Sequence, residues 1–297
     1  MPTCSRRILI LSFGLLHAAL ALSGTQEAGV LKVTHAERSV APGEIMLFRV
    51  QSPKAMADLR ATAFAREFRM FSESGADSWI GLVGIDMDTR PGTYAVEFHG
   101  VDKSGQPLTS SERINVISKS FPKRMLTVDP KFVNPPPEVM DRIRQESERV
   151  RIIFESTTAE RYWRGKFVVP VPGPVISDFG KRSVYNGQQR SSHAGTDFRG
   201  ATGTPIHAPN TGRVVLAADL YYSGNTVIID HGLGLYTYFG HMSEFGVKEG
   251  ERVERGAVVG KVGATGLVTG PHLHWTIRLA GTRVDPVSLL DLPEPVR

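Results

Sequence analysis

Glycine is concentrated in the last part of the chain, where it alternates with short runs of strand-forming residues. Twenty of the 30 glycines lie between Gly165 and Gly281. The runs between them are Val214 to Val215, Thr226 to Ile229, Val258 to Val259 and Trp275 to Ile277. No amphipathic helix of useful length interrupts this pattern. Many short strands joined by glycine turns predict an antiparallel β-sheet domain with tight corners over residues 167–291, followed by a tail at 292–297.

A second all-β unit is predicted over residues 24–118, which makes the chain mainly β. Two apolar strand candidates are Ile45 to Val50 and Trp79 to Met87, and Ile114 to Ile117 closes the series. Between them, residues 94, 96 and 98 are apolar and alternate with their neighbours, which is typical of a half-buried strand. The pattern favours a small β-sandwich. The Pro-Gly-Thr-Tyr turn at Pro91 resembles that of immunoglobulin-like (Ig-like) bacterial modules, although the disulfide of antibody domains is absent.

The linker between the two units, residues 119–166, has helical character from Glu138 to about Arg164. Its apolar residues fall near one helical face, with charged residues on the rest: Val139, Ile143, Val150, Ile153 and Phe154. We interpret this segment as one or two helices that pack between the domains. A sharper hypothesis is that the linker lies over the functional cleft and holds the protein latent.

The first 23 residues have the pattern of an export signal. Arg6 and Arg7 precede an apolar run from Ile8 to Leu22, which ends near small residues. Cleavage is the favoured interpretation, which leaves no transmembrane segment; the alternative is an uncleaved anchor, but about 15 residues are few for a spanning helix. Removing the two arginines changes the formal charge from +5 to +5 − 2 = +3, too mild for a nucleic-acid groove. The only cysteine, Cys4, is lost as well, so we expect a thiol-free periplasmic or secreted protein.

Six of the nine histidines lie in the glycine-rich part, and three of them belong to two clusters that suit a metal. On a strand, His272 and His274 share one face. His193 and Asp197 form the second cluster. A catalytic zinc site needs three protein ligands, which His193, Asp197 and one member of the 272/274 pair would supply.

The other histidines have different expected roles. The remaining member of the pair and His241 are the candidates for a general base. The competing interpretation is that His193 and Asp197 form a surface pair and that the other two histidines mark a strand edge. We expect a structural role for His231, and we expect His207, His35 and His99 to be surface residues without a ligand role.

These motifs closely resemble those of the lysostaphin/LytM-type zinc metallopeptidases, over about Val168 to Leu290. The matching stretches are His193-Ala-Gly-Thr-Asp197, Gly224-Asn-Thr-Val with Asp230-His-Gly, and Gly270-Pro-His-Leu-His274. The resemblance implies that His193, Asp197 and His274 hold Zn²⁺ and that His241 and His272 are catalytic. It also places Asn225 beside the substrate groove. One departure is Phe239, where the family usually has tyrosine.

The resemblance implies a zinc-dependent endopeptidase that hydrolyses peptide cross-links of bacterial peptidoglycan. One alternative is a non-catalytic relative that binds the wall or activates an amidase, but such relatives lose zinc ligands and this chain keeps all five positions. A second alternative is a lipoyl- or biotinyl-like carrier, which would require a lysine at a hairpin tip, and no suitable lysine is found.

Overall fold

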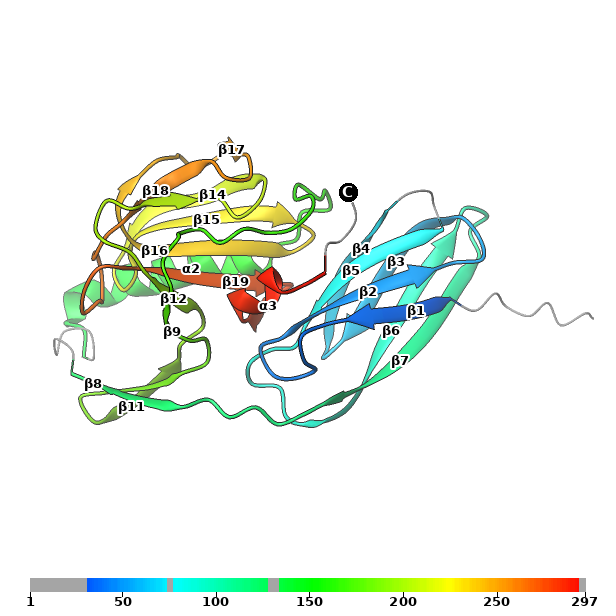
Figure 1. Cartoon of the computed structure of the whole chain (residues 1–297), viewed down its shortest axis with the longest axis horizontal. Coiled ribbons are helices and arrows are strands. Elements are labelled where there is room, and N and C mark those ends of the chain that lie inside the picture. The colour runs from blue at the N-terminus through cyan, green and yellow to red at the C-terminus, as the bar shows by residue number, and fades with distance from the viewer. Residues whose placement is uncertain (1–30, 74–76, 128–133, 294–297) are drawn as a thin grey trace, which may run out of the picture.

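The computed structural model describes residues 31–73, 77–127 and 134–293. The expected export signal at 1–23, including Cys4, lies outside the described residues, as do residues 294–297 of the expected tail. Two units built from antiparallel strands lie side by side (Figure 1), so the predicted mainly β class is confirmed. None of the helices in the described ranges is both long enough and apolar enough to span a membrane.

The first unit is a seven-stranded antiparallel sheet in the order β1-β2-β5-β4-β3-β6-β7. Its strands are β1 Lys32–Ala36, β2 Ile45–Gln51, β3 Met56–Ala63, β4 Arg66–Ser72, β5 Ser78–Gly84, β6 Gly92–Asp102 and β7 Pro107–Val116. Val96 and Phe98 are buried while Ala95 and Glu97 are exposed, so the predicted alternation in this strand is confirmed. The second apolar candidate is shorter than predicted, because β5 ends at Gly84.

Two features of this unit agree with the expected Ig-like module. The strand order reads as β1-β2-β5-β4 and β3-β6-β7, which is the order of the two sheets in constant Ig domains. Near the start of β6, Tyr94 Oη donates a hydrogen bond to the carbonyl oxygen of Arg90, 2.8 Å away, as in the tyrosine corner of that fold. Pairing of β3 with β4 joins the two sheets along one edge. Kinship with Ig-like modules stays a prediction.

The chain then crosses to the second unit and forms a short mixed sheet and a helix. β8 (Lys123–Leu126) pairs in parallel with β10 (Arg182–Tyr185), which also pairs with β11 (Gln188–Ser192). The 3-10 helix η1 (Pro137–Val139) leads into α2 (Met140–Glu155), which lies behind the large sheet in Figure 1. The helix thus ends about nine residues before the predicted Arg164. Ser156, at its C-cap, is extended, with φ −75° and ψ 157°.

The second unit is a ten-stranded sheet whose main path is β17-β14-β15-β16-β19-β12-β9. Its strands are β9 Val175–Ser177, β12 Thr196–Arg199, β13 Pro205–His207, β14 Gly212–Leu220, β15 Gly224–Gly232, β16 Leu235–Phe245, β17 Arg252–Val253, β18 Val258–Val262, β19 His272–Leu279 and β20 Thr282–Val284. A short helix, α3 (Pro286–Leu290), follows β20. The prediction of short antiparallel strands joined by glycine turns is confirmed.

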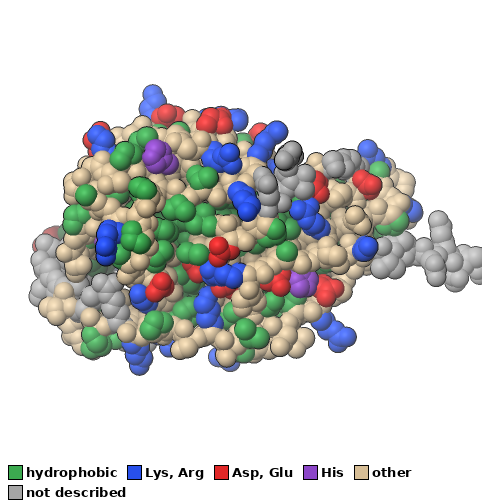
Figure 2. Space-filling model, in the orientation of Figure 1, with side chains coloured by type: hydrophobic (Ala, Val, Ile, Leu, Met, Phe, Trp, Pro, Cys, Tyr) green, Lys and Arg blue, Asp and Glu red, His purple; other side chains and the backbone are tan. Residues whose placement is uncertain are grey.

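Charged side chains are interspersed on the surface. On the face shown in Figure 2, lysine and arginine side chains lie among aspartate and glutamate rather than in one continuous basic patch. This distribution agrees with the mild formal charge of +5, and nothing on this face has the character of a nucleic-acid groove.

Candidate metal centre

Strands β12 and β19 bring the two histidine clusters together. They pair antiparallel, with Asp197 opposite His274. On β19, Leu273 and Trp275 are completely buried, whereas His272 and His274 are partly exposed. The alternation expected for this strand is therefore confirmed: its apolar residues fill the core and its imidazoles face the other side.

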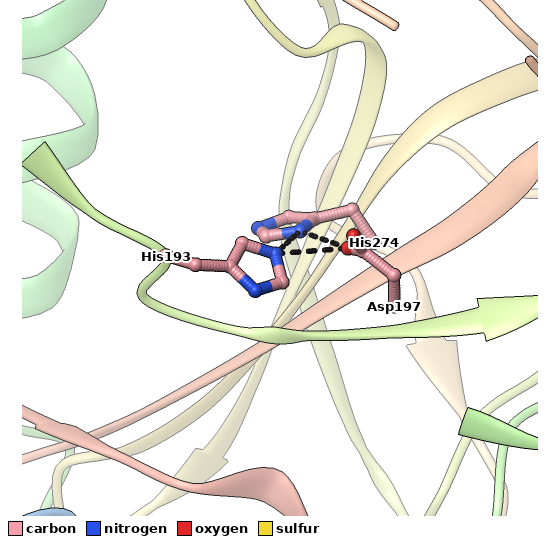
Figure 3. A group of neighbouring side chains, drawn as sticks. All are labelled: His193, Asp197 and His274. Atoms are coloured by element: carbon pink, nitrogen blue, oxygen red, sulfur yellow. Dashed lines mark hydrogen bonds and ion pairs between the residues drawn. The ribbon is translucent and has the colours of Figure 1, made fainter. Parts of the chain in front are cut away.

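His193, Asp197 and His274 form one compact cluster (Figure 3). The distance from His193 Nε2 to Asp197 Oδ1 is 2.9 Å, and that from His274 Nδ1 to the same oxygen is 2.8 Å. The two imidazole nitrogens are 3.0 Å apart. Residues 81 positions apart in the chain thus meet because the sheet returns on itself.

The outer ring nitrogens show which atoms of the cluster carry lone pairs. His193 Nδ1 lies 3.0 Å from the carbonyl oxygen of Asp178, which can only accept, so Nδ1 carries the proton and Nε2 faces the cluster unprotonated. His274 Nε2 lies 3.0 Å from the Thr276 hydroxyl, which can accept its proton. Two imidazole lone pairs and a carboxylate oxygen therefore converge. The lone pairs of these two nitrogens and one oxygen repel one another unless a cation lies among them. Two imidazoles and a carboxylate are a ligand set that suits a divalent metal.

The ionised state of Asp197 supports this interpretation. Burial alone would raise the pKa of its carboxyl group, but His193 and His274, when protonated toward it, outweigh that effect and hold the pKa well below its usual range. A cation among the unprotonated nitrogens would keep the carboxyl group ionised in the same way. A carboxylate that stays ionised while buried provides the negative charge that a cation needs.

His241 reaches the same site through a break in strand regularity. Across β15 and β16, Asn225 pairs with Met242 and Val227 pairs with Phe239, so Gly240 and His241 together face the single residue Thr226. This is a β-bulge. His241 has a left-handed φ of 63°, which is rare for a residue with a side chain and recurs at functional sites. Its Nδ1 lies 2.9 Å from the carbonyl oxygen of Thr265, so Nε2 carries the free lone pair.

His272 and His241 lie next to each other at the cluster. Their ring centroids are 5.0 Å apart, and His272 Nε2 is 3.8 Å from Asp197 Oδ1. His272 Nδ1 faces the carbonyl oxygen of Gly270 at 2.8 Å, which leaves its Nε2 unprotonated in the neutral ring. Burial lowers the pKa of His241 to about 3, so its ring is neutral near pH 7 and its Nε2 keeps a free lone pair.

The four histidines and Asp197 line a single cavity of about 740 Å³. Its lining residues come from α2, from β9 to β12, from β16 and β19, and from the loops at 222–223 and 267–269. They are Val150, Phe154, Ser177, Ser183, Tyr185, Ser192, His193, Ala194, Asp197, Tyr222, Ser223, Tyr238, His241, Leu267, Val268, Thr269, His272, His274, Thr276 and Arg278.

Several lining residues were not predicted from the sequence. Thr276 and Arg278 continue the 272/274 alternation on β19, and that periodicity could have found them. Val150 and Phe154 bring the linker helix into the cavity wall. The predicted apolar face is present, but it packs on the sheet of the second unit rather than between the two domains. The latency hypothesis stays a prediction. Nothing in the sequence pattern pairs this helix with the cavity.

The remaining candidates lie elsewhere or have other partners. Asn225 is not among the residues that line the cavity, and its backbone N–H donates to Thr265 Oγ1 at 2.9 Å. Phe239 is fully buried in the core, whereas the neighbouring Tyr238 lines the cavity. His231 is fully buried and bonded to Thr211 and Thr237, as expected for a structural residue. His207 lies outside the cavity and contacts the Gly256 carbonyl oxygen.

Comparison with known proteins also relates the part of the chain that carries this cluster to metallopeptidases. Residues 191–286 match the model of peptidase family M23. A Vibrio cholerae protein named peptidoglycan DD-endopeptidase ShyA is 39% identical over 115 residues, which are 38% of this chain and 27% of that protein. A Neisseria meningitidis protein named DD-carboxypeptidase/endopeptidase Mpg is 42% identical over 103 residues, 35% of this chain and 24% of that protein. The chain thus spans about a quarter of the length of these relatives.

A solved structure extends the likeness well beyond that segment. A Pseudomonas aeruginosa protein described as a peptidase M23 is 32% identical to this chain, with a TM-score of 0.67. The match covers 85% of this chain and 95% of that one, so it includes most of both β units. On the strength of the shared sequence, the shared fold and the His-Asp-His cluster, this chain belongs to peptidase family M23.

Proposed function

We propose that this protein is a zinc-dependent endopeptidase that hydrolyses peptide cross-links of bacterial peptidoglycan. The observation that carries the proposal is the convergence of two imidazole lone pairs and one ionised carboxylate, with two further imidazoles beside them, on one cavity. That arrangement provides a three-residue metal site with proton acceptors next to it. The names of the two bacterial relatives above support peptidoglycan peptides as the substrate.

Each residue has a definite part in the proposed chemistry. His193 Nε2, Asp197 Oδ1 and His274 Nδ1 would hold Zn²⁺. When bound, zinc polarises the scissile carbonyl group and lowers the pKa of water to about 7. The neutral ring of His241 accepts a proton through Nε2. The proton that His241 takes from the attacking water would pass to the leaving amine, and the imidazole of His272 beside it would stabilise the oxyanion that develops on the substrate carbonyl.

The rest of the proposal concerns the surroundings of this site. We assign the catalytic unit to residues 167–291 and the first β unit to 24–118, joined by the linker at 119–166. Asn225 is proposed to contact bound peptide at the edge of the groove rather than inside the cavity. Export by the segment 1–23 to the periplasm or the cell exterior would bring the enzyme to its substrate.

A non-catalytic relative that binds the wall or activates an amidase is the competing function. Such a protein does not need its metal ligands and proton acceptors in working geometry. Here all five side chains face one cavity, and the outer nitrogens of His193, His241 and His272 are held by backbone carbonyl groups. This arrangement favours the enzyme.

The test combines metal analysis with turnover of cross-linked muropeptides. Purified full-length protein should contain about one zinc per chain, should lose muropeptide cleavage on chelation and should regain it with added zinc. His274→Ala should lose both zinc and activity, since it removes one of three ligands. His241→Ala should keep zinc and lose activity by about 10²-fold or more, the size expected for a general acid or base.

His207→Ala is the matched control, because it removes an imidazole of the same domain that lies outside the cavity. It should keep both zinc and activity. Undiminished cleavage by His274→Ala would overturn the proposed ligand set, and wild-type protein that binds zinc but cleaves no muropeptide would favour the non-catalytic alternative.

A further inference from the structure

The cavity continues along β19 beyond the histidines and ends at an arginine. His272, His274, Thr276 and Arg278 share one face of this strand and all line the cavity. At about 3.3 Å per residue, Arg278 lies roughly 13 Å along the strand from His274. The guanidinium group is therefore in the same cleft as the metal cluster but several substrate atoms away from it.

Arg278 is a mostly buried cation without an anion beside it. Its Nε is buried and has no hydrogen-bond partner, and no described residue accepts a hydrogen bond from the rest of its side chain. The carboxyl group with the largest electrostatic effect on Arg278 is that of Asp86. Asp86 is already paired with Arg283, whose Nη2 lies 2.5 Å from Asp86 Oδ1. Burial lowers the pKa of Arg278 to about 10, which leaves it charged near pH 7.

The contact that holds Arg278 is aromatic. Its guanidinium carbon lies 5.2 Å from the ring centroid of Phe154 on α2, within cation–π range. This contact orients the side chain but satisfies none of its N–H donors. A buried N–H without a partner, such as that of Nε here, costs folding free energy, and a ligand in the cavity would provide the missing acceptor.

The charges that line the cavity indicate which ligand fits. Of the lining side chains that the structure describes, Arg278 is the one permanent cation and Asp197 the one carboxylate, and Asp197 belongs to the metal cluster. With a metal bound, the cleft presents positive charge at two separated points. A guanidinium group binds a carboxylate through two parallel hydrogen bonds, which gives both affinity and fixed geometry.

We propose that Arg278 binds a carboxylate of the substrate peptide and thereby sets which peptide bond lies at the metal. The proposal rests on the peptidase function proposed above and adds a positioning residue for the substrate. Two carboxylates of a cross-linked peptide have this chemistry, one at a chain end and one on a side chain. A peptide that offers neither is held only at the metal cluster and is cleaved less efficiently.

The test uses full-length, zinc-loaded protein and three cross-linked muropeptides: one with all carboxyl groups free, one amidated at the chain end and one amidated on the side chain. For the wild type, one of the two amidations should lower kcat/KM by about 10- to 100-fold, mainly through KM, as expected for losing charge-assisted hydrogen bonds. Which of the two it is identifies the carboxylate. Arg278→Gln should lose the same factor on the free substrate and become indifferent to amidation. Arg278→Lys should keep part of the preference.

Arg252→Gln is the matched control, because it removes an arginine charge from the same domain at an exposed position on β17. It should leave both kcat/KM and the preference unchanged. Melting temperature and zinc content check that each variant is folded. If Arg278→Gln fails to fold, Arg278→Lys and the wild-type response to amidation decide the question.

Equal kcat/KM of the wild type for all three substrates would overturn the role of Arg278 while leaving the peptidase function intact. A preference for the non-amidated substrate that persists in Arg278→Gln would also overturn the role of Arg278, since another group would then bind the carboxylate. Absence of cleavage of every substrate would instead contradict the proposed function itself.

Discussion

At the scale of single residues, the cavity is organised by hydrogen bonds at the outer nitrogens of its imidazoles. His193, His241 and His272 each face a backbone carbonyl oxygen, at 3.0, 2.9 and 2.8 Å. His274 differs, because its outer Nε2 faces the hydroxyl of Thr276. Three ring orientations are thus fixed by the backbone, and one depends on a side chain that mutation can remove.

Thr276→Val should therefore weaken metal binding without disturbing the fold. Valine has nearly the same shape, but it cannot accept the Nε2–H hydrogen bond that orients His274. Loss of such a partner typically lowers metal affinity by about 10- to 100-fold. Competition with a zinc chelator measures the effect. Thr276→Ser keeps the hydroxyl and should stay within about threefold of the wild type, so equal losses in both variants would contradict this role.

The same residues show how far the sequence could predict the site. The 272/274 alternation was sufficient to place two imidazoles on one face and Leu273 and Trp275 in the core. The same alternation does not predict that the side chain of His241 faces the cavity. Regular alternation would put it on the face of the buried Phe239, and only the bulge opposite Thr226 turns it toward the cavity. Such a bulge depends on pairing with another strand, which a local pattern does not contain.

At the scale of elements, α2 both supports the large sheet and closes part of the cavity. Phe154 packs with Leu216, Leu220, Ile228 and Tyr236 in a separate apolar cluster beneath the helix. Nearer the start of the helix, the side chain of Arg142 bonds to Asp219, and Glu146 accepts a hydrogen bond from the backbone N–H of Tyr221 at 2.8 Å. The linker helix is therefore part of the second β unit in structural terms.

Phe154→Ala should lower the free energy of unfolding by about 3 kcal/mol, because it removes a large buried ring and leaves a cavity. Denaturant unfolding measures this loss. Ile152→Ala on the same helix is the control, since Ile152 is 55% exposed and its truncation should cost about 0.5 kcal/mol or less. A similar cost for both changes would mean that α2 does not pack on the sheet as described.

The end of α2 also marks a limit of sequence reasoning. The segment after Glu155 was expected to continue as helix, yet Ser156 and Thr158 leave it. The Ser156 hydroxyl lies 2.7 Å from Tyr236 Oη, and Thr158 Oγ1 donates to Asp230. Both partners belong to strands more than 70 residues later in the chain. The sequence shows the apolar helical face, but it does not show these distant partners.

At the scale of the whole molecule, the two β units are fixed to one another. The backbone N–H of Ile45 donates to Ser288 Oγ at 2.8 Å, and that of Asp285 donates to the Gly43 carbonyl oxygen at 2.7 Å. Buried residues of both units belong to one continuous apolar cluster. Arg283 adds a charged contact, since its backbone and side chain both donate to Asp86 of the first unit.

This charged contact should make the attachment of the two units depend on pH. Burial alone would raise the pKa of Asp86, but hydrogen bonds from Arg283 outweigh it and hold the pKa below the usual 3.8. A carboxyl group whose pKa is lower in the folded state stabilises fully above its unfolded pKa, and its contribution is lost as the pH falls through the folded pKa. The contact is therefore complete at pH 7 and fails only below about pH 3.8.

Asp86→Asn should lower the free energy of unfolding, and the difference from the wild type should become smaller as the pH falls. At pH 7 the variant should be less stable than the wild type by about 2 kcal/mol, the value of charge-assisted hydrogen bonds. At pH 3 the gap should be smaller, because the carboxyl group of the unfolded chain is then mostly protonated, which removes part of the advantage of the ionised group in the fold. Denaturant unfolding at both pH values measures it. Asp58→Asn, at a position whose side chain is 55% exposed, should change stability by about 0.5 kcal/mol or less at either pH. A gap for Asp86→Asn that is equal at pH 7 and pH 3 would show that shape rather than charge holds the two units together there.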